Sequence, residues 1–245
     1  GNVNMAGAPL LSGLAALRSG AGKVTIATKR QHIAIITSHS PELMAAACED
    51  QATLAQLIDN ADVLVIGPGL GQDEWAKMML TTCLESDKAK IIDADALNLI
   101  ATGKFDKITN AVFTPHLKEA ARLLNVELSE ILSDKTAALN KLLQKYQNVM
   151  VLKGNASLVK AADNDTTYIC TYGNPGMAIA GMGDALTGVI AALIGQNVAP
   201  LDAARLAVAI HGRAGDLVAK TIGERGLLVS DLIELLPNVI NNKYE

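Results

Sequence analysis

The stretch Asp62–Leu84, DVLVIGPGLGQDEWAKMMLTTCL, places a strand, a glycine-rich turn and a helix in immediate succession. Its first five residues form an apolar run that is typical of a strand buried on both faces of a sheet. Gly67–Gly71 (GPGLG) then ends the strand, since glycine and proline are the common residues of tight turns. The segment 74–84 predicts a helix, so this stretch reads as one strand–loop–helix unit of a parallel sheet.

Similar units extend in both directions along the chain. We predict strands at 23–28, 33–37, 62–66, 90–93, 111–114 and 149–153, followed by a hairpin of two strands at 158–160 and 167–171. We predict helices at 10–19, 41–48, 74–84, 96–100, 118–124, 133–146, 184–194, 201–221 and 228–241, with Pro237 bending or breaking the last one. This alternation predicts an α/β fold in one domain over residues 1–245, in which helices cover both faces of a mostly parallel central sheet.

The composition fits a globular α/β protein and excludes several classes of function. Of the 245 residues, 50% are hydrophobic but only 3% are aromatic, so the core must be built from Ala, Leu, Ile and Val. The net charge of −4 and the dispersed basic residues argue against a nucleic acid or an anionic membrane as partner. The three cysteines and four histidines show no spacing of a disulfide framework or a metal site. With no signal peptide and no apolar run of membrane-spanning length, we expect a cytoplasmic protein.

The richest chemical signal is the segment Gly173–Gly188, GNPGMAIAGMGDALTG, in which five glycines surround Asp184 and an apolar helix follows. Glycines let the backbone approach a ligand, and the helix start adds unpaired N–H groups and the positive end of the helix dipole. This combination predicts an anion site, at which Asp184 would act as the base for a hydroxyl that attacks phosphorus. The alternative is that Asp184 only caps the helix. We expect Asn174 to order the turn.

Polar or glycine-rich tags also follow four of the predicted strands. They are the segments 67–71 (GPGLG), 93–98 (DADALN), 114–116 (TPH) and 153–155 (KGN). The carboxyl ends of parallel strands meet at one edge of a sheet, and ligands bind there. The sequence therefore predicts one site that is built from all four tags, although GPGLG by itself would also serve as a plain tight turn.

The side chains in these tags each have a structural and a functional interpretation. Of Asp93 and Asp95, we expect one to cap the following helix, and the other would hold Mg²⁺ through water. His116 is either a helix cap or a hydrogen-bond donor to a polar substrate. Lys153 ends a buried strand, where its charge needs a phosphate or a nearby Asp as partner. His211 lies in a helical stretch, and we expect it to pack there.

The motifs GPGLG, DADALN, TPH, VLKG, GNPGMAIAGMGDALTG, HGRAGD and GERGLLVSDL occur in this order along the chain. Together they resemble the ADP-dependent (S)-NAD(P)H-hydrate dehydratase family over residues 8–237, and more distantly the ribokinase-like superfamily. The resemblance implies a three-layer α/β fold and a reaction that removes water from the 6S hydrate of NADH or NADPH, with ADP converted to AMP and phosphate. It also implies Mg²⁺, a homotetramer, and an epimerase, separate or fused, that supplies the 6S form.

The functional residues of that family carry over onto the matching positions of this sequence. Asp184 would deprotonate the 6-hydroxyl of the hydrate, and the N–H groups of Gly181, Met182 and Gly183 would hold the charge on the transferred phosphoryl group. The nucleotide segment matches Lys153, Gly154, Asn155, Ala156 and Ser157, with Gly183 near the phosphates. The positions matching the site of the hydrated nicotinamide nucleotide are Ala8, Gly69, His116 and Asp184, to which we add Asn174. No residue is assigned as a direct metal ligand.

The sequence departs from the family pattern at three places. The family carries a glycine-rich first strand before the helix at Leu10, and we expect that strand to be missing from residues 1–245. Pro9 stands where many relatives have Ala, beside the matched Ala8. In the nucleotide segment, Asn155 and Ser157 replace the commoner Ala and Thr, and Ser157 keeps the hydroxyl group.

Other classes of function would use the same features. A small-molecule kinase of the ribokinase-like group, acting on a vitamin or a sugar, would share the anion turn and the base but release a stable phosphoester. A non-catalytic sensor of adenine nucleotides would be expected to lack the base, whereas Asp184 is present. The chain would also fit as one half of a bifunctional epimerase–dehydratase.

Overall fold

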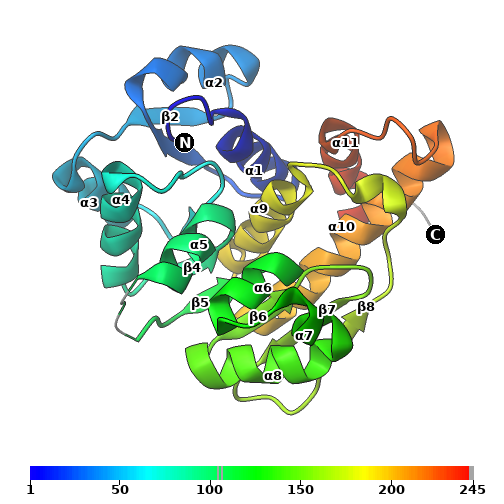
Figure 1. Cartoon of the computed structure of the whole chain (residues 1–245). Helices are drawn as coiled ribbons and strands as arrows, with labels where there is room; N and C mark the ends of the chain where they lie inside the picture. The colour runs from blue at the N-terminus through cyan, green and yellow to red at the C-terminus, as the bar shows by residue number, and fades with distance from the viewer. Residues whose placement is uncertain (104, 106, 243–245) are drawn as a thin grey trace.

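The structure is a computed structural model, and it describes residues 1–103, 105 and 107–242. Its centre is a six-stranded sheet in the order β3-β4-β5-β6-β7-β8, accompanied by a separate two-stranded sheet of β1 and β2 (Figure 1). The strands are β1 (Thr25–Thr28), β2 (Met44–Ala47), β3 (Val63–Ile66), β4 (Ala89–Ile92), β5 (Ala111–Phe113), β6 (Val149–Leu152), β7 (Ser157–Ala161) and β8 (Tyr168–Cys170). Strands β3 to β6 pair in parallel, as do β1 and β2, whereas β7 and β8 are the predicted antiparallel hairpin.

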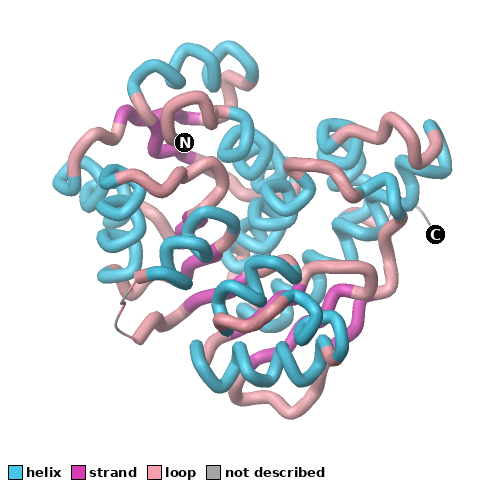
Figure 2. Tube along the Cα trace, viewed as in Figure 1, coloured by secondary structure: helices cyan, strands magenta, loops and turns pink. Residues whose placement is uncertain are grey.

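Helices enclose the larger sheet from both faces (Figure 2). They are α1 (Gly7–Arg18), α2 (Ile33–His39), α3 (Gln51–Asp59), α4 (Glu74–Glu85), α5 (Ala94–Thr102), α6 (Leu117–Leu124), α7 (Leu128–Ser133), α8 (Lys135–Tyr146), α9 (Met182–Gly195), α10 (Pro200–Ile222) and α11 (Val229–Ile240), with short 3₁₀ helices η1 (Arg30–His32) and η2 (Pro175–Met177). The prediction of an α/β fold with a mostly parallel sheet between two helical layers is confirmed.

The core explains why the central strands are apolar throughout. Alternate side chains of a strand point to opposite faces of the sheet. Ile92 and Phe113 pack into a cluster with residues of α3 to α8, whereas their neighbours Ile91 and Val112 pack into a second cluster with residues of α1, α9, α10 and α11. Both faces are therefore buried, and the strands read as continuous apolar runs with no alternation.

Two neighbouring predictions near the start of the chain are wrong. The segment 33–37, predicted as a strand, lies in the helix α2, and the segment 41–48, predicted as a helix, contains the strand β2. In the first, buried residues recur every four positions at His32, Ile36 and Ser40, a helical period that the β-branched isoleucines conceal. In the second, the alanines of β2 favour a helix, but the parallel pairing with β1 overrides that preference.

Other differences concern helices. Helices α3 and α7 were not predicted. The N-cap of α3 could have been recognised in the sequence, since the Asp50 carboxylate accepts a hydrogen bond from the Thr53 N–H. The predicted break at Pro237 does not occur, because α11 continues through it to Ile240. Leu236 and Val239 are buried in the core on either side, and this packing holds the helix despite the missing N–H. Across the described residues, no helix combines the length and apolar character needed to cross a membrane.

Candidate active site

The four tags lie at the carboxyl ends of β3, β4, β5 and β6, along one edge of the sheet. In the first tag, Gly67, Gly69 and Gly71 have positive φ angles of 129°, 58° and 74°. A Cβ atom at Gly67 would collide with the carbonyl oxygen of Asp93, so only glycine lets this turn pack against the next loop. The Gly71 N–H also donates a 2.9 Å hydrogen bond to Asp95 Oδ2. The first two tags are thereby joined into one unit.

A buried ion pair joins the second tag to the fourth. Lys153 Nζ lies 2.6 Å from Asp93 Oδ1, and the side chains are 17% and 2% exposed. Asp93 stands at the N-cap position of α5 without capping it, and Asp95 is engaged with Gly71. The prediction that one of the two carboxylates caps α5 is therefore wrong. Ala94 follows Asp93 with a φ of 47°, a left-handed conformation that costs a non-glycine residue roughly 1 kcal/mol.

Helix α9 begins directly against this ion pair. Gly181 is its N-cap residue, with a φ of 94°, and the N–H groups of the first turn have no acceptor within the helix. A Cβ atom on Gly183 would lie 3.0 Å from Lys153 Nζ and 3.3 Å from Asp93 Oδ2. The glycine therefore allows the open start of the helix, with its positive dipole end, to lie next to Lys153. Two sources of positive potential meet there, which suits a phosphate group.

Asp184 lies in the first turn of α9 and is not the residue that caps it, so the simple capping interpretation is wrong. Burial raises the pKa of Asp184 to about 6, Asp93 and Asp95 add to the rise through like-charge repulsion, and Lys153 opposes it. A carboxyl group with a pKa close to the working pH is well suited to accept a proton. Its environment therefore fits a general base.

His116 is the N-cap residue of α6. Its Nδ1 accepts hydrogen bonds from the N–H groups of Lys118 and Glu119, at 3.1 Å and 3.2 Å, and the Glu119 carboxylate accepts one from the His116 N–H at 2.8 Å. Since Nδ1 is an acceptor, we assign the ring proton to Nε2. Burial, with Lys153 nearby, lowers the pKa of His116, and burial raises that of Glu119 to about 7. The half-exposed ring is thus a neutral helix cap, and its Nε2 lies 3.4 Å from Glu119 Oε1.

The segment Lys153–Ser157 forms the turn between β6 and β7. The Lys153 N–H donates to the carbonyl oxygen of Pro115 at 2.8 Å, which ties the turn to the TPH tag. Ser157 Oγ donates to the Gly154 carbonyl oxygen at 3.2 Å and lies 3.3 Å from the Gly154 nitrogen. Ala156 has a φ of 57°, a second left-handed residue at this edge of the sheet. The turn is held by its own hydroxyl group, which leaves the backbone beside Lys153 on the surface.

Helix α10 holds the turn before α9 in place through hydrogen bonds and close packing. Asn174 Oδ1 accepts a 3.0 Å hydrogen bond from the Gly176 N–H. The Asp216 carboxylate on α10 accepts from the Gly173 N–H at 2.9 Å and from Asn174 Nδ2 at 3.0 Å. Side chains at Gly212 and Gly215, on the same helix, would collide with the residues Tyr172 and Met177. The motif HGRAGD is therefore the support on which this turn lies, and its His211 is buried, as expected.

The structure thus brings together four predicted site residues and the two carboxylates that were expected to cap α5 or to hold Mg²⁺ through water. We call the cluster of Asp93, Asp95, His116, Lys153, Gly183 and Asp184 the polar corner. Ala8 lies in the first turn of α1, next to Pro9, which is close to Gly69. Two contributors were not singled out from the sequence. Glu119 is readable from the capping-box spacing after His116, and Asp216 from its place in HGRAGD.

The polar corner fits Mg²⁺ only as an ion shared with a bound ligand. Within residues 1–103, 105 and 107–242, no group of three or more His, Cys, Asp or Glu side chains is placed to hold a metal ion. Asp93 and Asp95 offer hard carboxylate oxygens, but Lys153 and the Gly71 N–H already engage one oxygen of each. This donor set suits an ion that keeps several waters and binds ligand phosphates.

Comparison with known proteins places this arrangement in a family. The sequence profile of the family described as NAD(P)H-hydrate dehydratase matches residues 1–238. The chain belongs to the NAD(P)H-hydrate dehydratase family. This dehydratase-family chain is 45% identical to the bifunctional NAD(P)H-hydrate repair enzyme Nnr of Escherichia coli and 43% identical to that of Coxiella burnetii, over 98% of its own length in each case. The alignments cover 46% and 49% of those enzymes, so the chain spans about half the length of these relatives.

Solved structures show the same fold. The ADP/ATP-dependent NAD(P)H-hydrate dehydratase of Bacillus subtilis, co-crystallised with ATP/Mg²⁺, superposes with a TM-score of 0.88 at 30% identity, covering 100% of this chain and 87% of that one. A ribokinase-like superfamily protein of Enterococcus faecalis gives a TM-score of 0.90 at 32% identity, with coverages of 99% and 84%. The hydroxyethylthiazole kinase of Pyrococcus horikoshii, at 18% identity and a TM-score of 0.66, shares the fold alone. The dehydratase-family fold is therefore ribokinase-like.

Proposed function

We propose that this chain dehydrates the 6S hydrate of NADH or NADPH at the expense of ADP, releasing NAD(P)H, AMP and phosphate. The observation that carries the proposal is the position of Asp184 in a chain of the dehydratase family. Its carboxyl group has a raised pKa and lies at the open first turn of α9, next to the ion pair of Lys153 and Asp93. A base beside an anion-binding helix start is what phosphoryl transfer to a hydroxyl group requires.

In the first step, the Asp184 carboxylate takes the proton of the 6-hydroxyl group while that oxygen attacks the β-phosphorus of ADP. The bond between the β-phosphorus and the bridging oxygen breaks, and AMP leaves with the electron pair. The N–H groups of Gly181, Met182 and Gly183, at the start of α9, would stabilise the charge on the transferred phosphoryl group. The product of this step is a phosphate ester at C6 of the nicotinamide ring.

In the second step, the lone pair of the ring nitrogen expels phosphate from C6. Phosphate is a far better leaving group than hydroxide, which is why the phosphoryl transfer helps. Loss of the proton at C5 then restores the carbon–carbon double bond of the dihydronicotinamide. The oxygen atom of the original hydroxyl group therefore leaves in the inorganic phosphate.

The nucleotide is assigned to the turn Lys153–Ser157. Lys153 directly follows β6, and its ammonium group lies next to Gly183 in the first turn of α9. The backbone of Gly154, Asn155 and Ala156 follows it in the turn. Mg²⁺ bound with the nucleotide would neutralise phosphate charge, with Asp93 and Asp95 as its water-mediated protein partners. An approaching phosphate would share Lys153 with Asp93, so its own charge would need Mg²⁺ and the start of α9 as further partners.

The hydrated nicotinamide nucleotide is assigned to the other side of Asp184. A polar substrate group would share the Nε2–H of the neutral His116 ring with Glu119 Oε1, which lies 3.4 Å from Nε2. The Gly69 turn lies along the same sheet edge. Ala8 and Asn174 border this assignment from α1 and from the turn before α9. Both reactants then meet at the carboxylate of Asp184.

The test follows the absorbance of the reduced nicotinamide after purified protein, Mg²⁺, chemically prepared NADH hydrate and ADP are mixed. We expect the band to grow only when ADP is present, with one AMP and one phosphate formed per NADH. Hydrate labelled with ¹⁸O at the 6-hydroxyl should yield labelled phosphate. Growth of the band without phosphate release, or label recovered in water, would contradict the phosphoryl-transfer route. ATP in place of ADP measures the nucleotide preference.

The kinase alternative predicts a different product from the same site. A kinase would release a stable phosphoester and form no reduced nicotinamide. The family match disfavours it, and the likeness to a kinase at 18% identity concerns the fold alone. Detection of a stable phosphoester as the end product would nevertheless decide for it.

We also propose that the chain works as a homotetramer and receives the 6S hydrate from an epimerase, separate or fused. The relatives named as bifunctional repair enzymes are about twice as long as this chain, which supports a companion activity. The mass of the assembly in solution and the rate of repair of the 6R hydrate, with and without an added epimerase, test the two parts separately.

A further inference from the structure

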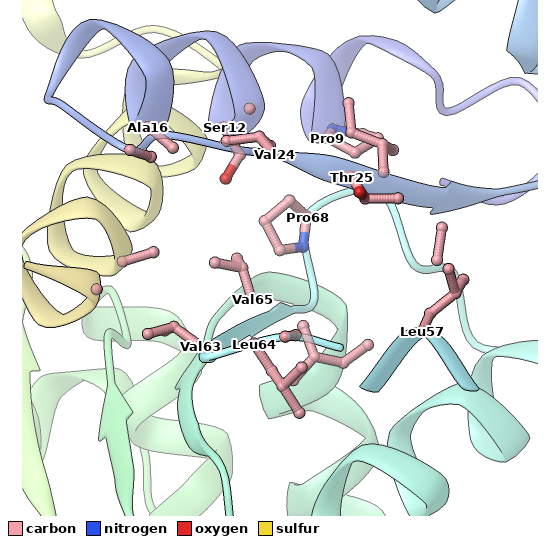
Figure 3. A pocket seen from close by; sticks show the side chains of 18 of the residues that line it. Pro9, Ser12, Ala16, Val24, Thr25, Leu57, Val63, Leu64, Val65 and Pro68 are labelled. Carbon is pink, nitrogen blue, oxygen red and sulfur yellow. The ribbon is translucent and has the colours of Figure 1, made fainter. Parts of the chain in front are cut away.

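Two buried hydroxyl groups join α1 to the backbone of Asp184. Ser12 lies on α1, at the wall of the cavity shown in Figure 3, and its Oγ is 2.9 Å from Thr187 Oγ1. Both residues are buried. Thr187 Oγ1 donates to the Asp184 carbonyl oxygen at 2.7 Å. A hydroxyl group has one proton to give, so Ser12 donates to Thr187. We call Ser12 and Thr187 the hydroxyl pair, and its hydrogen bonds end on the residue that is assigned as the base.

A glycine brings the two helices together beside this pair. A Cβ atom on Gly188 would collide with the Ser12 carbonyl oxygen and would lie 2.9 Å from the Ala16 nitrogen. Only glycine therefore lets the backbones of α1 and α9 touch at this point. Because the backbones are so close, the short side chains of Ser12 and Thr187 can reach each other. The contact is thus fixed by Gly188 and by the hydroxyl pair next to it.

The two helices run side by side in the same direction. The first contact joins Gly188 to Ser12. Eight residues further along each chain, Gln196 follows α9 and Gly20 follows α1, and a Cβ atom on Gly20 would lie 3.1 Å from Gln196 Nε2. Equal steps along both chains therefore lead from one contact to the next, which is the pattern of two parallel helices in one register.

The same register places the base beside the substrate side of the candidate site. Asp184 comes four residues before Gly188 on α9, and Ala8 comes four residues before Ser12 on α1. Four residues are about one helical turn, so each lies on the face of its helix that carries the contact. Ala8 and Asp184 are therefore level with each other, one turn nearer the start of their helices.

We propose that Ser12 and Thr187 are positioning residues, whose hydroxyl pair holds the first turn of α9 in the register that sets the Asp184 carboxylate opposite Ala8. The inference rests on the proposed function, because it takes Asp184 as the base and Ala8 as part of the substrate side. Both hydroxyl groups are buried, so they act through the Asp184 carbonyl oxygen. Without the pair, the first turn of α9 can shift along α1, and a displacement of about 1 Å is enough to slow a reaction strongly.

A purely structural role is the alternative, since a Thr hydroxyl that bonds to a carbonyl oxygen in the preceding turn is a common feature of helices. Thr82 on α4 is an example in the same molecule. It is buried, and its Oγ1 donates to the Met78 carbonyl oxygen at 2.9 Å. Thr82→Val is therefore a matched control, because it removes a bond of the same kind from a helix that carries no residue of the polar corner.

The test compares Thr187→Val, Thr187→Ser and Thr82→Val with the wild type. Valine keeps the shape of threonine without the hydroxyl group, whereas serine keeps the hydroxyl group. Steady-state rates with NADH hydrate and ADP give kcat and KM, and urea denaturation gives the stability. We expect Thr187→Val to lower kcat by about tenfold with little change in the KM for ADP, and Thr187→Ser to restore most of the rate. Thr82→Val should lower the urea midpoint and leave kcat unchanged.

A second readout does not depend on turnover. The pKa of the Asp184 carboxyl group, measured by NMR on the ligand-free protein, should fall toward its ordinary value of 3.8 in Thr187→Val, because a displaced first turn lets water reach the carboxylate. It should stay at the wild-type value in Thr187→Ser and Thr82→Val. Ser12→Ala should shift the pKa in the same direction as Thr187→Val. In the double variant the two shifts should not add, since both substitutions break one contact.

Equal losses of kcat in Thr187→Val and Thr82→Val would overturn the proposal, because the hydroxyl pair would then only stabilise the fold. An unchanged Asp184 pKa in Thr187→Val would overturn it as well. If Thr187→Val folds poorly, Ser12→Ala carries the same two measurements. A wild type that forms no NADH would contradict the proposed function alone, and the pKa measurements would still decide on the hydroxyl pair.

Discussion

The polar corner and the slot, a cavity of about 820 Å³ lined by residues of β1 and β3, are bounded in opposite ways. In the polar corner, Asp93 pairs with Lys153, Asp95 accepts from Gly71, and His116 accepts from the start of α6, so loops far apart in sequence hold one another. In the slot, two strand edges face each other across apolar walls. The comparison teaches that side-chain hydrogen bonds hold the corner together, whereas apolar packing alone bounds the slot. Changes in the corner should therefore affect turnover before stability, and changes of β1 or β3 in the slot the reverse.

The largest expected effect on the corner comes from Asp184→Asn. The amide keeps the shape of the side chain but accepts no proton, so turnover should fall by about 10³-fold while both ligands still bind. Steady-state rates with NADH hydrate and ADP measure the first effect, and calorimetric titration of ADP measures the second. Hydrogen exchange at Thr25, Ala27, Val63 and Val65 should be unchanged, because these residues of β1 and β3 line the slot and not the corner. An active Asp184→Asn protein would remove the base assignment.

The next largest effect is expected when the ion pair between Lys153 and Asp93 is broken. Lys153→Met leaves the Asp93 carboxylate buried without its partner, which should lower the free energy of unfolding by about 3 kcal/mol. Urea denaturation measures the loss, and ADP affinity should fall as well. Because Lys153 has both a structural and a ligand role in this assignment, a matched variant is needed to separate them.

That matched variant is the double substitution Lys153→Met with Asp93→Asn, which removes the stranded charge. It should recover most of the lost stability, since a buried pair replaced as a whole costs far less than a broken one. ADP affinity should stay low if Lys153 contacts the nucleotide. Recovery of ADP affinity together with stability would show that Lys153 is a structural residue.

How much of this was predictable differs between the two regions. The strands β3 to β6 and the edge where their tags meet follow from apolar runs, each ended by a polar or glycine-rich turn. The segments 33–39 and 44–47 beside the slot could not be read in this way. There the choice between helix and strand depends on pairing between β1 and β2, which is a tertiary contact.

The corner itself was predictable as a location but not as a network. Lys153 was expected to need a phosphate or an Asp, and the sequence could not choose, because Asp93 is 60 residues away. The same limit applies to Asp216, which is 42 residues from Asn174, so the motif HGRAGD marks the residue but not the turn that its carboxylate supports. Distances between residues far apart in sequence are set by how helices and strands pack, and local patterns do not contain them.

Asp216→Ala tests whether turnover depends on the hydrogen bonds by which α10 holds the turn before α9. The substitution removes the acceptor for the Gly173 N–H and Asn174 Nδ2, so the turn before α9 should lose its fixed position. We expect kcat to fall about tenfold with a smaller change in ADP affinity, which is the signature of a positioning residue. Asp216→Asn, which keeps one carbonyl oxygen, should restore part of the rate. Equal losses in both variants would mean that the charge of Asp216 matters and not its position.

Substitutions of His116 should have a smaller effect. The capping of α6 and the contact of the ring with the hydrate can be tested separately. His116→Ala removes the N-cap of α6 and should cost about 1 kcal/mol of stability, together with a raised KM for the hydrate. His116→Ser restores a capping oxygen without the ring. Its stability should approach that of the wild type, while the KM for the hydrate stays high and the KM for ADP is normal. If serine restores both, His116 acts only as a cap.

The smallest expected effect is on the pH dependence of stability, because the ionised carboxylate of Asp184 destabilises the folded protein. Its pKa of about 6 lies above the ordinary 3.8, so the folded protein binds this proton more tightly than the unfolded chain does. The stability from this proton is therefore complete below about pH 4 and is lost as the pH rises through about 6. Asp184→Asn has no such loss. Its free energy of unfolding relative to the wild type should rise by about 1 kcal/mol between about pH 4 and pH 7, less than the full shift because the carboxylate is partly solvated. Glu119 titrates in both proteins and cancels in the difference. A constant difference across this range would show that Asp184 ionises as a solvated carboxylate does, and the corner would then be a less buried site than its geometry indicates.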